Sequence, residues 1–269
     1  MPELPEVEAV CRRLRESLNG NPQIVAAKIL RPSVSRPQDP AAVEQQLAGA
    51  SITNVRRIGK HILVGLQGAR TLHVHLRMTG NLYLIPDIRF RTTTTRAWLE
   101  LHGGSGIVFD DPRALGKMQV HQTATLEAAL ADTVGPEPHQ ITAAEFAALA
   151  KRARKPMKLL LMDQAKIAGL GNIYAAEALF EAKIDPAKLA STVSKPRLER
   201  LHSIIVKMLE DAKESAYRAY TEPGYFSEGE SFPVQVYDRE GEPCHACQRP
   251  IKRMPQGGRS TYYCSGCQR

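Results

Sequence analysis

The spacing of apolar residues predicts a helix at the amino terminus of the chain. Apolar residues recur at the interval of one helical face from Val7 to Leu18, and Asn19-Gly20 follows as a stop signal. Cys11 lies on this apolar face. We therefore interpret Cys11 as a core residue and not as a reactive thiol.

Residues 24–120 have the pattern of a strand-rich region. From Leu72 to Met78, apolar residues alternate with His73, His75 and Arg77, as in a half-buried strand. Glycine and proline residues separate this segment from similar ones. The further predicted strands are His61–Leu66, Arg96–Leu101 and Gly106–Asp110. Together they predict an antiparallel sandwich or barrel that packs with the first helix.

The pattern becomes helical after Val134-Gly135-Pro136-Glu137-Pro138. A turn-rich stretch, Glu222–Pro233, then leads to a short tail that contains four cysteines. The whole chain therefore predicts an α+β fold. The predicted helices are Ala143–Arg152, Met157–Gln164, Asn172–Lys183 and Pro196–Tyr220.

The charge balance points to a polyanionic partner. The 269 residues include 36 Lys and Arg against 28 Asp and Glu, a net charge of +8. Nucleic acid and an acidic membrane surface are the two candidates. No run of about 18 apolar residues occurs, so we expect no membrane-spanning helix. The start Met1-Pro2-Glu3 lacks the pattern of a secretory signal, so we expect a cytoplasmic protein.

The carboxy-terminal tail has the spacing of a metal site. Cys244 and Cys247 form one Cys-x2-Cys pair, Cys264 and Cys267 form a second pair, and 16 residues separate the two pairs. Two such pairs suit one structural Zn²⁺ ion bound by four thiolates. His245 lies within the first pair, but four sulfur ligands are the preferred set. From Cys244 to Arg269 there are five Lys and Arg residues and no Asp or Glu, which favours contact with nucleic acid.

Pro2 is a candidate nucleophile. Removal of Met1 would expose a secondary α-amine, whose pKa of about 8 leaves a useful neutral fraction at pH 7. Attack of this amine on an aldehyde gives an iminium ion, which acts as an electron sink for elimination. Glu3 and Glu6 would supply nearby carboxyl groups for proton transfer. Pro2 taken alone is also compatible with an ordinary amino terminus.

Two basic runs and one glycine turn are further candidates for contact with phosphate. The runs are Arg56–Lys60 and Lys151–Lys158, and either could instead be a solvated surface. The turn Gly169-Leu170-Gly171-Asn172 lies between two predicted helices. Its backbone amides could approach a phosphate, and Asn172 could cap the following helix, whose start attracts anions.

Three motifs occur together and in order: Pro2–Glu8, Leu161–Tyr174, and Gly241–Cys244 with the cysteine spacing that follows it. On these motifs the chain resembles the bacterial formamidopyrimidine-DNA glycosylases, relatives of the endonuclease VIII glycosylases. Leu4 and Val134–Pro138 favour the formamidopyrimidine branch. The resemblance implies an N-terminal β-sandwich catalytic domain (1–133), a helical helix-two-turn-helix DNA-binding domain (134–231) and a zinc finger (232–269).

The resemblance also implies an activity. The protein would be a bifunctional DNA glycosylase and apurinic/apyrimidinic lyase that removes oxidised or ring-opened purines and cuts by β,δ-elimination. Pro2 would form the Schiff base, and Glu3 would transfer protons. Lys60 and Arg259 would assist catalysis at the lesion phosphates. His75 and Asn172 would contact phosphates, Lys158 would lie near the damaged base, and Met78, Arg113 and Leu115 would fill the space left by the everted nucleotide. The implied partner is damaged double-stranded DNA, bound by a monomer.

Three departures from the family pattern bear on the lesion range. Leu115 replaces the usual phenylalanine wedge, and Arg77 replaces a common glycine. The loop after the long helix, Ala216–Phe226, is shortened where relatives cover an everted 8-oxoguanine. We therefore expect 8-oxoguanine not to be the best substrate. The alternatives are an oxidised-pyrimidine glycosylase like endonuclease VIII, a non-catalytic relative that binds damaged DNA, and an RNA-binding zinc-ribbon protein.

Overall fold

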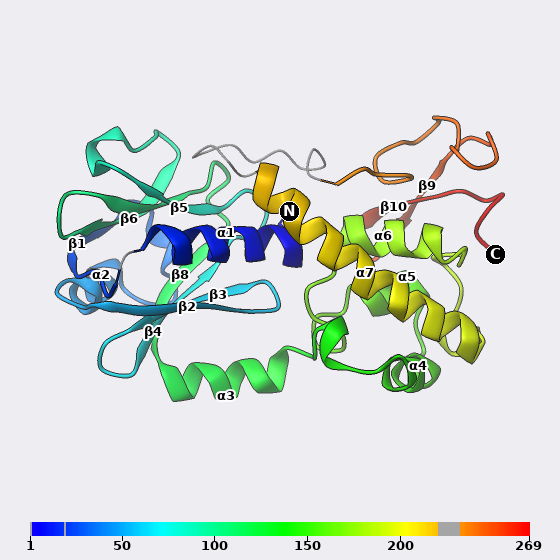
Figure 1. The fold of residues 1–269 in the computed structure, drawn as a ribbon, viewed down its shortest axis with the longest axis horizontal. Helices are drawn as coiled ribbons and strands as arrows, with labels where there is room; N and C mark the ends of the chain where they lie inside the picture. The colour runs from blue at the N-terminus through cyan, green and yellow to red at the C-terminus, as the bar shows by residue number, and fades with distance from the viewer. Residues whose placement is uncertain (1, 19, 220–231) are drawn as a thin grey trace. The chain divides into compact units, whose positions relative to one another are not determined.

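A computed structural model describes residues 2–18, 20–219 and 232–269. The chain divides into two compact units (Figure 1). The first unit comprises Met1–Asp132 with Lys213–Ser231, and the second comprises Thr133–Ala212 with Phe232–Arg269. The predicted α+β class is confirmed, while the division into three domains stays a prediction. No helix among the described residues is long and apolar enough to cross a lipid bilayer.

The first unit contains two four-stranded antiparallel sheets. One has the strand order β1-β6-β7-β5, and the other β2-β3-β4-β8. Alternate side chains of both sheets enter one core, which includes Val64, Leu72, Leu99 and Phe109. The strands are β1 (Ile24–Ile29), β2 (Ile52–Ile58), β3 (His61–Leu66), β4 (Arg70–His75), β5 (Asn81–Ile85), β6 (Thr95–Leu101), β7 (Gly106–Asp110) and β8 (Lys117–Gln122).

Helices accompany the sheets of this unit. They are α1 (Leu4–Ser17), α2 (Pro40–Leu47) and α3 (Thr123–Thr133), with short 3₁₀ turns at Pro32–Val34 and Ile88–Phe90. The predicted amino-terminal helix is confirmed as α1. Cys11 is fully buried, and burial raises the pKa of its thiol to about 12, as expected of a core cysteine. Helices α2 and α3 were not predicted because each buries only two large apolar residues.

Strand β4 ends at His75, three residues before the alternating pattern ends at Met78. The chain turns there because Arg77 adopts a left-handed backbone with φ 59°. The amide of Gly80 donates to the carbonyl of Leu76 at 3.0 Å, and a Cβ on Gly80 would lie 2.4 Å from that oxygen. The prediction of a strand through Met78 was therefore wrong, since alternation also fits a tight turn that follows a strand.

The second unit is helical and ends in a two-stranded hairpin. Its elements are α4 (Ala143–Arg152), α5 (Met157–Leu161), α6 (Asn172–Glu181), the part of α7 (Lys195–Ala219) up to Ala212, and strands β9 (Lys252–Gln256) and β10 (Arg259–Tyr263), with 3₁₀ turns at Pro138–Gln140 and Ala190–Thr192. Helix α5 ends before the predicted Gln164. The amide side chain of Gln164 instead donates to the carbonyl of Leu170 and accepts from the amide of Gly169, which fixes the turn before α6.

A buried carboxylate anchors the tail of the second unit. Glu177 of α6 is 1 % exposed and accepts hydrogen bonds from the backbone amides of Gln235, Val236 and Tyr237 at 2.8–3.0 Å. Burial raises the pKa of Glu177, and the three amides partly offset that effect. Because these amides directly precede the cysteine-bearing segment, Glu177 attaches that segment to α6.

Four histidines line the face of the second sheet that points away from the core. His61 stacks on His73 with ring centroids 5.0 Å apart and meets His75 edge-on at 4.9 Å, while His121 lies 5.9 Å from His73. Burial, followed by nearby positive charge, lowers the pKa of His61 to about 4 and of His73 and His75 to about 3. The row is therefore neutral at pH 7.

This row predicts a pH-dependent loss of stability. Below about pH 6.5 the histidines bind protons in the unfolded chain but not in the folded protein. The free energy of unfolding therefore falls as the pH drops toward 4. We expect a loss on the order of 1 kcal/mol per histidine between pH 7 and pH 5.5. Denaturant unfolding measures this loss, and the double variant His61→Gln/His73→Gln should show a shallower fall. An equal fall in both proteins would contradict the prediction.

Candidate functional site

Pro2 and Glu3 lie immediately before α1. Both residues are buried, and Glu3 is 1 % exposed. Glu3 is the N-cap of the helix: its amide donates to the Glu6 carboxylate at 2.8 Å, and its own carboxylate accepts from the Glu6 amide, forming a capping box. Met1 lies outside the described residues. The helix start therefore fixes the position of Glu3 directly after the predicted nucleophile.

Arg57 links α1 to the turn that carries Lys60. Its side chain is 8 % exposed, and its guanidinium donates to the Glu8 carboxylate and to the Gly59 carbonyl, both at 2.8 Å. Burial would raise the pKa of Glu8, but hydrogen bonds and charge from Arg57 and Arg15 outweigh burial and lower it. Gly59 has φ 55°, and Lys60 is only 6 % exposed. One side chain thus holds both the helix after Pro2 and the turn before Lys60.

Two loops of the first unit carry the three predicted space-filling side chains. Met78 lies in the loop after β4, and Arg113 and Leu115 lie in the loop between β7 and β8. Thr79 connects the loops: its hydroxyl donates to the Asp111 carboxylate at 2.5 Å and accepts from the Arg113 amide at 3.3 Å. The two loops are therefore held next to each other.

The side chain of Leu115 is 46 % exposed, and Arg113 is also exposed. Gly116 follows in a position that excludes larger residues, since a Cβ there would lie 2.4 Å from the Phe109 ring. Its amide donates to the Asp111 carboxylate at 2.7 Å. Leu115 is therefore not a core residue but an apolar side chain held at the surface.

The hydrogen bonding of His75 defines its tautomer. Its Nδ1 accepts a hydrogen bond from the Arg77 amide at 3.0 Å. Because the lowered pKa of His75 keeps the imidazole neutral, the ring proton lies on Nε2. His75 is thereby prepared to donate one hydrogen bond to an anion without carrying a charge.

In the second unit, Asn172 and Lys158 both bind the hairpin. Gly171 is the N-cap of α6 and Asn172 is its first residue, so the predicted capping role of Asn172 was wrong. The Asn172 side-chain amide donates to the Ser260 carbonyl at 3.0 Å. Lys158 is fully buried, and its ammonium group donates to the same carbonyl at 3.0 Å and to the Thr261 hydroxyl at 2.7 Å. The basic run 151–158 is thus not wholly a solvated surface.

These contacts fix the residue next to Arg259. Arg259 begins β10, is exposed, and follows the turn Gly257-Gly258, where both glycines have positive φ. The Ser260 carbonyl, one residue further on, is the group that Lys158 and Asn172 share. Two of the predicted DNA-contacting residues therefore also set the position of a third.

The four predicted metal ligands meet at one point. The sulfur atoms of Cys244, Cys247, Cys264 and Cys267 all lie within 4.8 Å of one another. Four thiolates at this separation fit a tetrahedral structural metal ion with no open position. His245 is exposed, and its Nδ1 lies 3.1 Å from the Gln235 side-chain oxygen, outside this set.

The predicted residues fall into two groups, one in each unit. Sequence reasoning missed Arg57, Thr79, Asp111 and Glu177, which touch the predicted residues or anchor their segments. Arg57 was noted only as part of a basic run, because its partner Glu8 lies 49 residues away. The first group is Pro2, Glu3, Lys60, His75, Met78, Arg113 and Leu115; the second is Lys158, Asn172, Arg259 and the four cysteines.

These features define a class of protein with a two-sheet unit, a helical unit and a four-cysteine hairpin. The chain belongs to the formamidopyrimidine-DNA glycosylase family. Residues 1–118 match the family's N-terminal domain, and residues 134–221 match its H2TH domain. A formamidopyrimidine-DNA glycosylase of Ruegeria sp. is 37 % identical over 289 residues, with each chain covered fully. That of Chloroflexus aurantiacus is 39 % identical over 277 residues, covering 100 % of this chain and 98 % of the relative.

Solved structures agree with this assignment. The Lactococcus lactis protein in complex with DNA containing N7-benzyl-Fapy-dG has a TM-score of 0.89 and 28 % identity, with 99 % of each chain covered. The same protein in complex with DNA containing an abasic site gives the same values. The predicted family is therefore confirmed.

Because Lys158 donates to the Ser260 carbonyl, we predict that Lys158 stabilises the hairpin locally. We expect Lys158→Met to increase amide hydrogen exchange in β9 and β10 at least tenfold, since the Ser260 carbonyl and the Thr261 hydroxyl lose a charged donor worth about 1.5–3 kcal/mol. Hydrogen–deuterium exchange with mass spectrometry measures this, with Lys155→Met as the control. Unchanged exchange in the hairpin of the Lys158 variant would refute this role.

Proposed function

We propose that this protein is a DNA glycosylase and apurinic/apyrimidinic lyase of base excision repair that uses Pro2 as its nucleophile. The observation that carries the proposal is the buried Pro2-Glu3 pair at the start of α1, on the helix that Arg57 ties to the Lys60 turn. A binding module would need neither an amino-terminal proline nor a buried carboxylate beside it. Both residues belong to a chain of the formamidopyrimidine-DNA glycosylase family.

The chemistry begins when Met1 is removed. The Pro2 nitrogen then attacks C1′ of the damaged nucleotide, the glycosidic bond breaks, and the base leaves. Glu3 protonates the sugar ring oxygen as the ring opens, which gives an iminium ion between Pro2 and C1′. Loss of a C2′ proton expels the 3′ phosphate, and a second elimination expels the 5′ phosphate. Water then hydrolyses the Schiff base and frees Pro2.

The remaining site residues would hold damaged double-stranded DNA. Lys60, His75, Asn172 and Arg259 would contact phosphates near the lesion, so affinity should fall as salt rises. Asn172 uses one amide hydrogen on Ser260 and has a second for a phosphate. We assign Lys158 to positioning Arg259, in place of the contact with the damaged base expected from the family. Met78, Arg113 and Leu115 would occupy the space left by the everted nucleotide, with Leu115 as the wedge.

The four cysteines would hold one Zn²⁺ ion. Such an ion supplies structure and not chemistry, because four thiolates leave it no open position. It would stabilise the hairpin that carries Arg259, while Glu177 anchors the segment leading to it. We further propose a cytoplasmic location and action as a single chain.

The proposed lesion range is ring-opened formamidopyrimidines, further-oxidised guanines and abasic sites in preference to 8-oxoguanine. The support is the short connection after α7, of which residues 220–231 lie outside the described part of the chain. We expect single-turnover cleavage of a formamidopyrimidine duplex to be at least tenfold faster than that of a matched 8-oxoguanine duplex. Equal rates would refute this preference, and faster cleavage of oxidised pyrimidines would favour the endonuclease VIII alternative.

The proposed nucleophile is tested by borohydride trapping on an abasic duplex. We expect a covalent protein–DNA adduct with the unaltered protein and none with Pro2→Gly carrying a blocked amino terminus. Glu3→Gln should lower base excision at least a hundredfold, the usual scale for loss of a general acid, and Glu16→Gln, an exposed change on the same helix, should not. Adduct formation by the blocked variant would disprove the role of Pro2. Tight RNA binding without any adduct would favour the RNA-binding alternative.

A further inference from the structure

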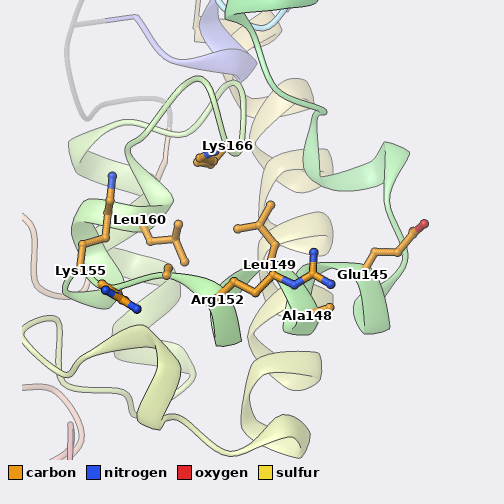
Figure 2. Close-up of a pocket in the computed structure, with 9 residues that line it drawn as sticks. Glu145, Ala148, Leu149, Arg152, Lys155, Leu160 and Lys166 are labelled. Carbon is orange, nitrogen blue, oxygen red and sulfur yellow. The ribbon is translucent and has the colours of Figure 1, made fainter.

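A pocket in the second unit lies apart from the residues assigned above. Its volume is about 660 Å³, and it lies between α4 and the segment that runs from Ala153 through α5 to Lys166 (Figure 2). Within this unit, α4 and the hairpin of β9 and β10 lie on opposite sides of α5 and α6 (Figure 1). None of the proposed catalytic, DNA-contacting or cysteine residues lines the pocket.

The rim of the pocket is strongly basic. Arg152, Arg154, Lys155 and Lys166 line it, against a single acidic residue, Glu145. The Glu145 carboxylate is already occupied by the Thr142 amide and hydroxyl, both at 2.8 Å.

Among the residues that the structure describes, one of the four rim cations has an ion-pair partner. Lys155 pairs with Asp163 at 2.7 Å. Within the described residues, the side chains of Arg152, Arg154 and Lys166 have no ion pair, and all three are exposed. These three exposed charges give the rim a positive potential that would attract an anionic partner.

The interior of the pocket is apolar. Leu149 of α4 and Leu160 of α5 lie on two sides of the space, with Ala148 and Ala153 completing the lining (Figure 2). A DNA backbone would use the rim cations but leave this apolar lining open to water. A peptide that places an apolar side chain between carboxylates would use both features, since the side chain removes apolar surface from water while the carboxylates pair with the rim.

We propose that this pocket, defined by Arg152, Arg154, Lys166, Leu149 and Leu160, binds an acidic peptide segment of a partner protein that carries a large apolar side chain. Carboxylates of the segment pair with the two arginines and the lysine, and the apolar side chain packs against Leu149, above the buried Leu160. The partner would bind the helical unit without occupying the residues assigned to the lesion. Recruitment to a site of repair would then be separate from catalysis.

Fluorescence anisotropy with a defined probe tests the proposal. The probe is a fluorescein-labelled peptide, Gly-Glu-Asp-Leu-Phe-Asp-Glu-Gly, added to the full-length protein at about 50 mM salt. We expect a Kd of about 10–100 µM, at least tenfold weaker binding by Arg152→Glu and by Lys166→Glu, and a change of less than twofold for Arg200→Glu. Arg200 is an exposed cation of the same unit outside the pocket, so its reversal changes net charge equally.

Two altered peptides test the apolar and the charged features of the pocket separately. Replacing Leu and Phe by Ser, or the acids by Gln and Asn, should each weaken binding at least tenfold. No binding up to 1 mM, equal binding of the Ser peptide, or an equal loss in Arg200→Glu would overturn the proposal. So would a matching tenfold loss of affinity for undamaged duplex DNA in Arg152→Glu and Lys166→Glu, which would identify the rim as part of the DNA-binding surface. Thermal melting within about 2 °C of the unaltered protein verifies that each variant is folded.

Discussion

The first unit depends on one buried guanidinium. Arg57 donates to Glu8, two helical turns from Pro2, and to the carbonyl of Gly59, the residue before Lys60. A charged group with this little exposure is costly unless its hydrogen bonds are made, so the contact favours one arrangement of the helix and the turn. A nucleophile at a chain terminus would otherwise fray, as terminal residues generally do. The capping box at Glu3 and the Arg57 contact together give this terminus the rigidity of a packed element.

In the second unit, hydrogen bonds to one backbone carbonyl group stabilise the hairpin. Its hairpin is short, and two strands alone are marginally stable in water. Lys158 and Asn172 converge on the Ser260 carbonyl, and Glu177 binds three consecutive amides ahead of the cysteines. With zinc bound to the four thiolates, the hairpin that carries the exposed Arg259 would be attached at three places. Buried polar groups of α5 and α6 therefore support a side chain that belongs to neither helix.

Much of the fold followed from periodicity. Strands β3 and β7 and helix α4 have the predicted bounds, since each of them buries most of its apolar residues within its own unit. Helices α2 and α3 could not be predicted from periodicity, because each buries too few apolar residues to show a helical period. The end of β4 depends on the backbone of Arg77 and Gly80, where alternation continues through a turn.

The site residues were predicted from motifs and from the family resemblance, but the residues that hold them in place were not predicted. The cysteines form a local pattern, and their sulfur atoms meet as that pattern requires. Arg57, Thr79 and Glu177 act on partners 49, 32 and about 59 residues away, so only the folded chain shows their partners. Asn172 illustrates the reverse error: its position at a helix start suggested a cap, but its side chain binds the hairpin instead.

The central claim is that Arg57 holds the start of α1 and the Lys60 turn in the geometry that the Pro2 reaction needs. The most direct measurement is the single-turnover rate of the borohydride-trapped adduct on an abasic duplex for Arg57→Ala, with Arg12→Ala, a half-buried arginine of α1 that pairs with Glu16 and Glu214, as the control. We predict a rate at least tenfold lower for Arg57→Ala, because small misplacements of a nucleophile are costly, and a rate within twofold for Arg12→Ala. An unchanged rate in a folded Arg57→Ala protein would contradict the account.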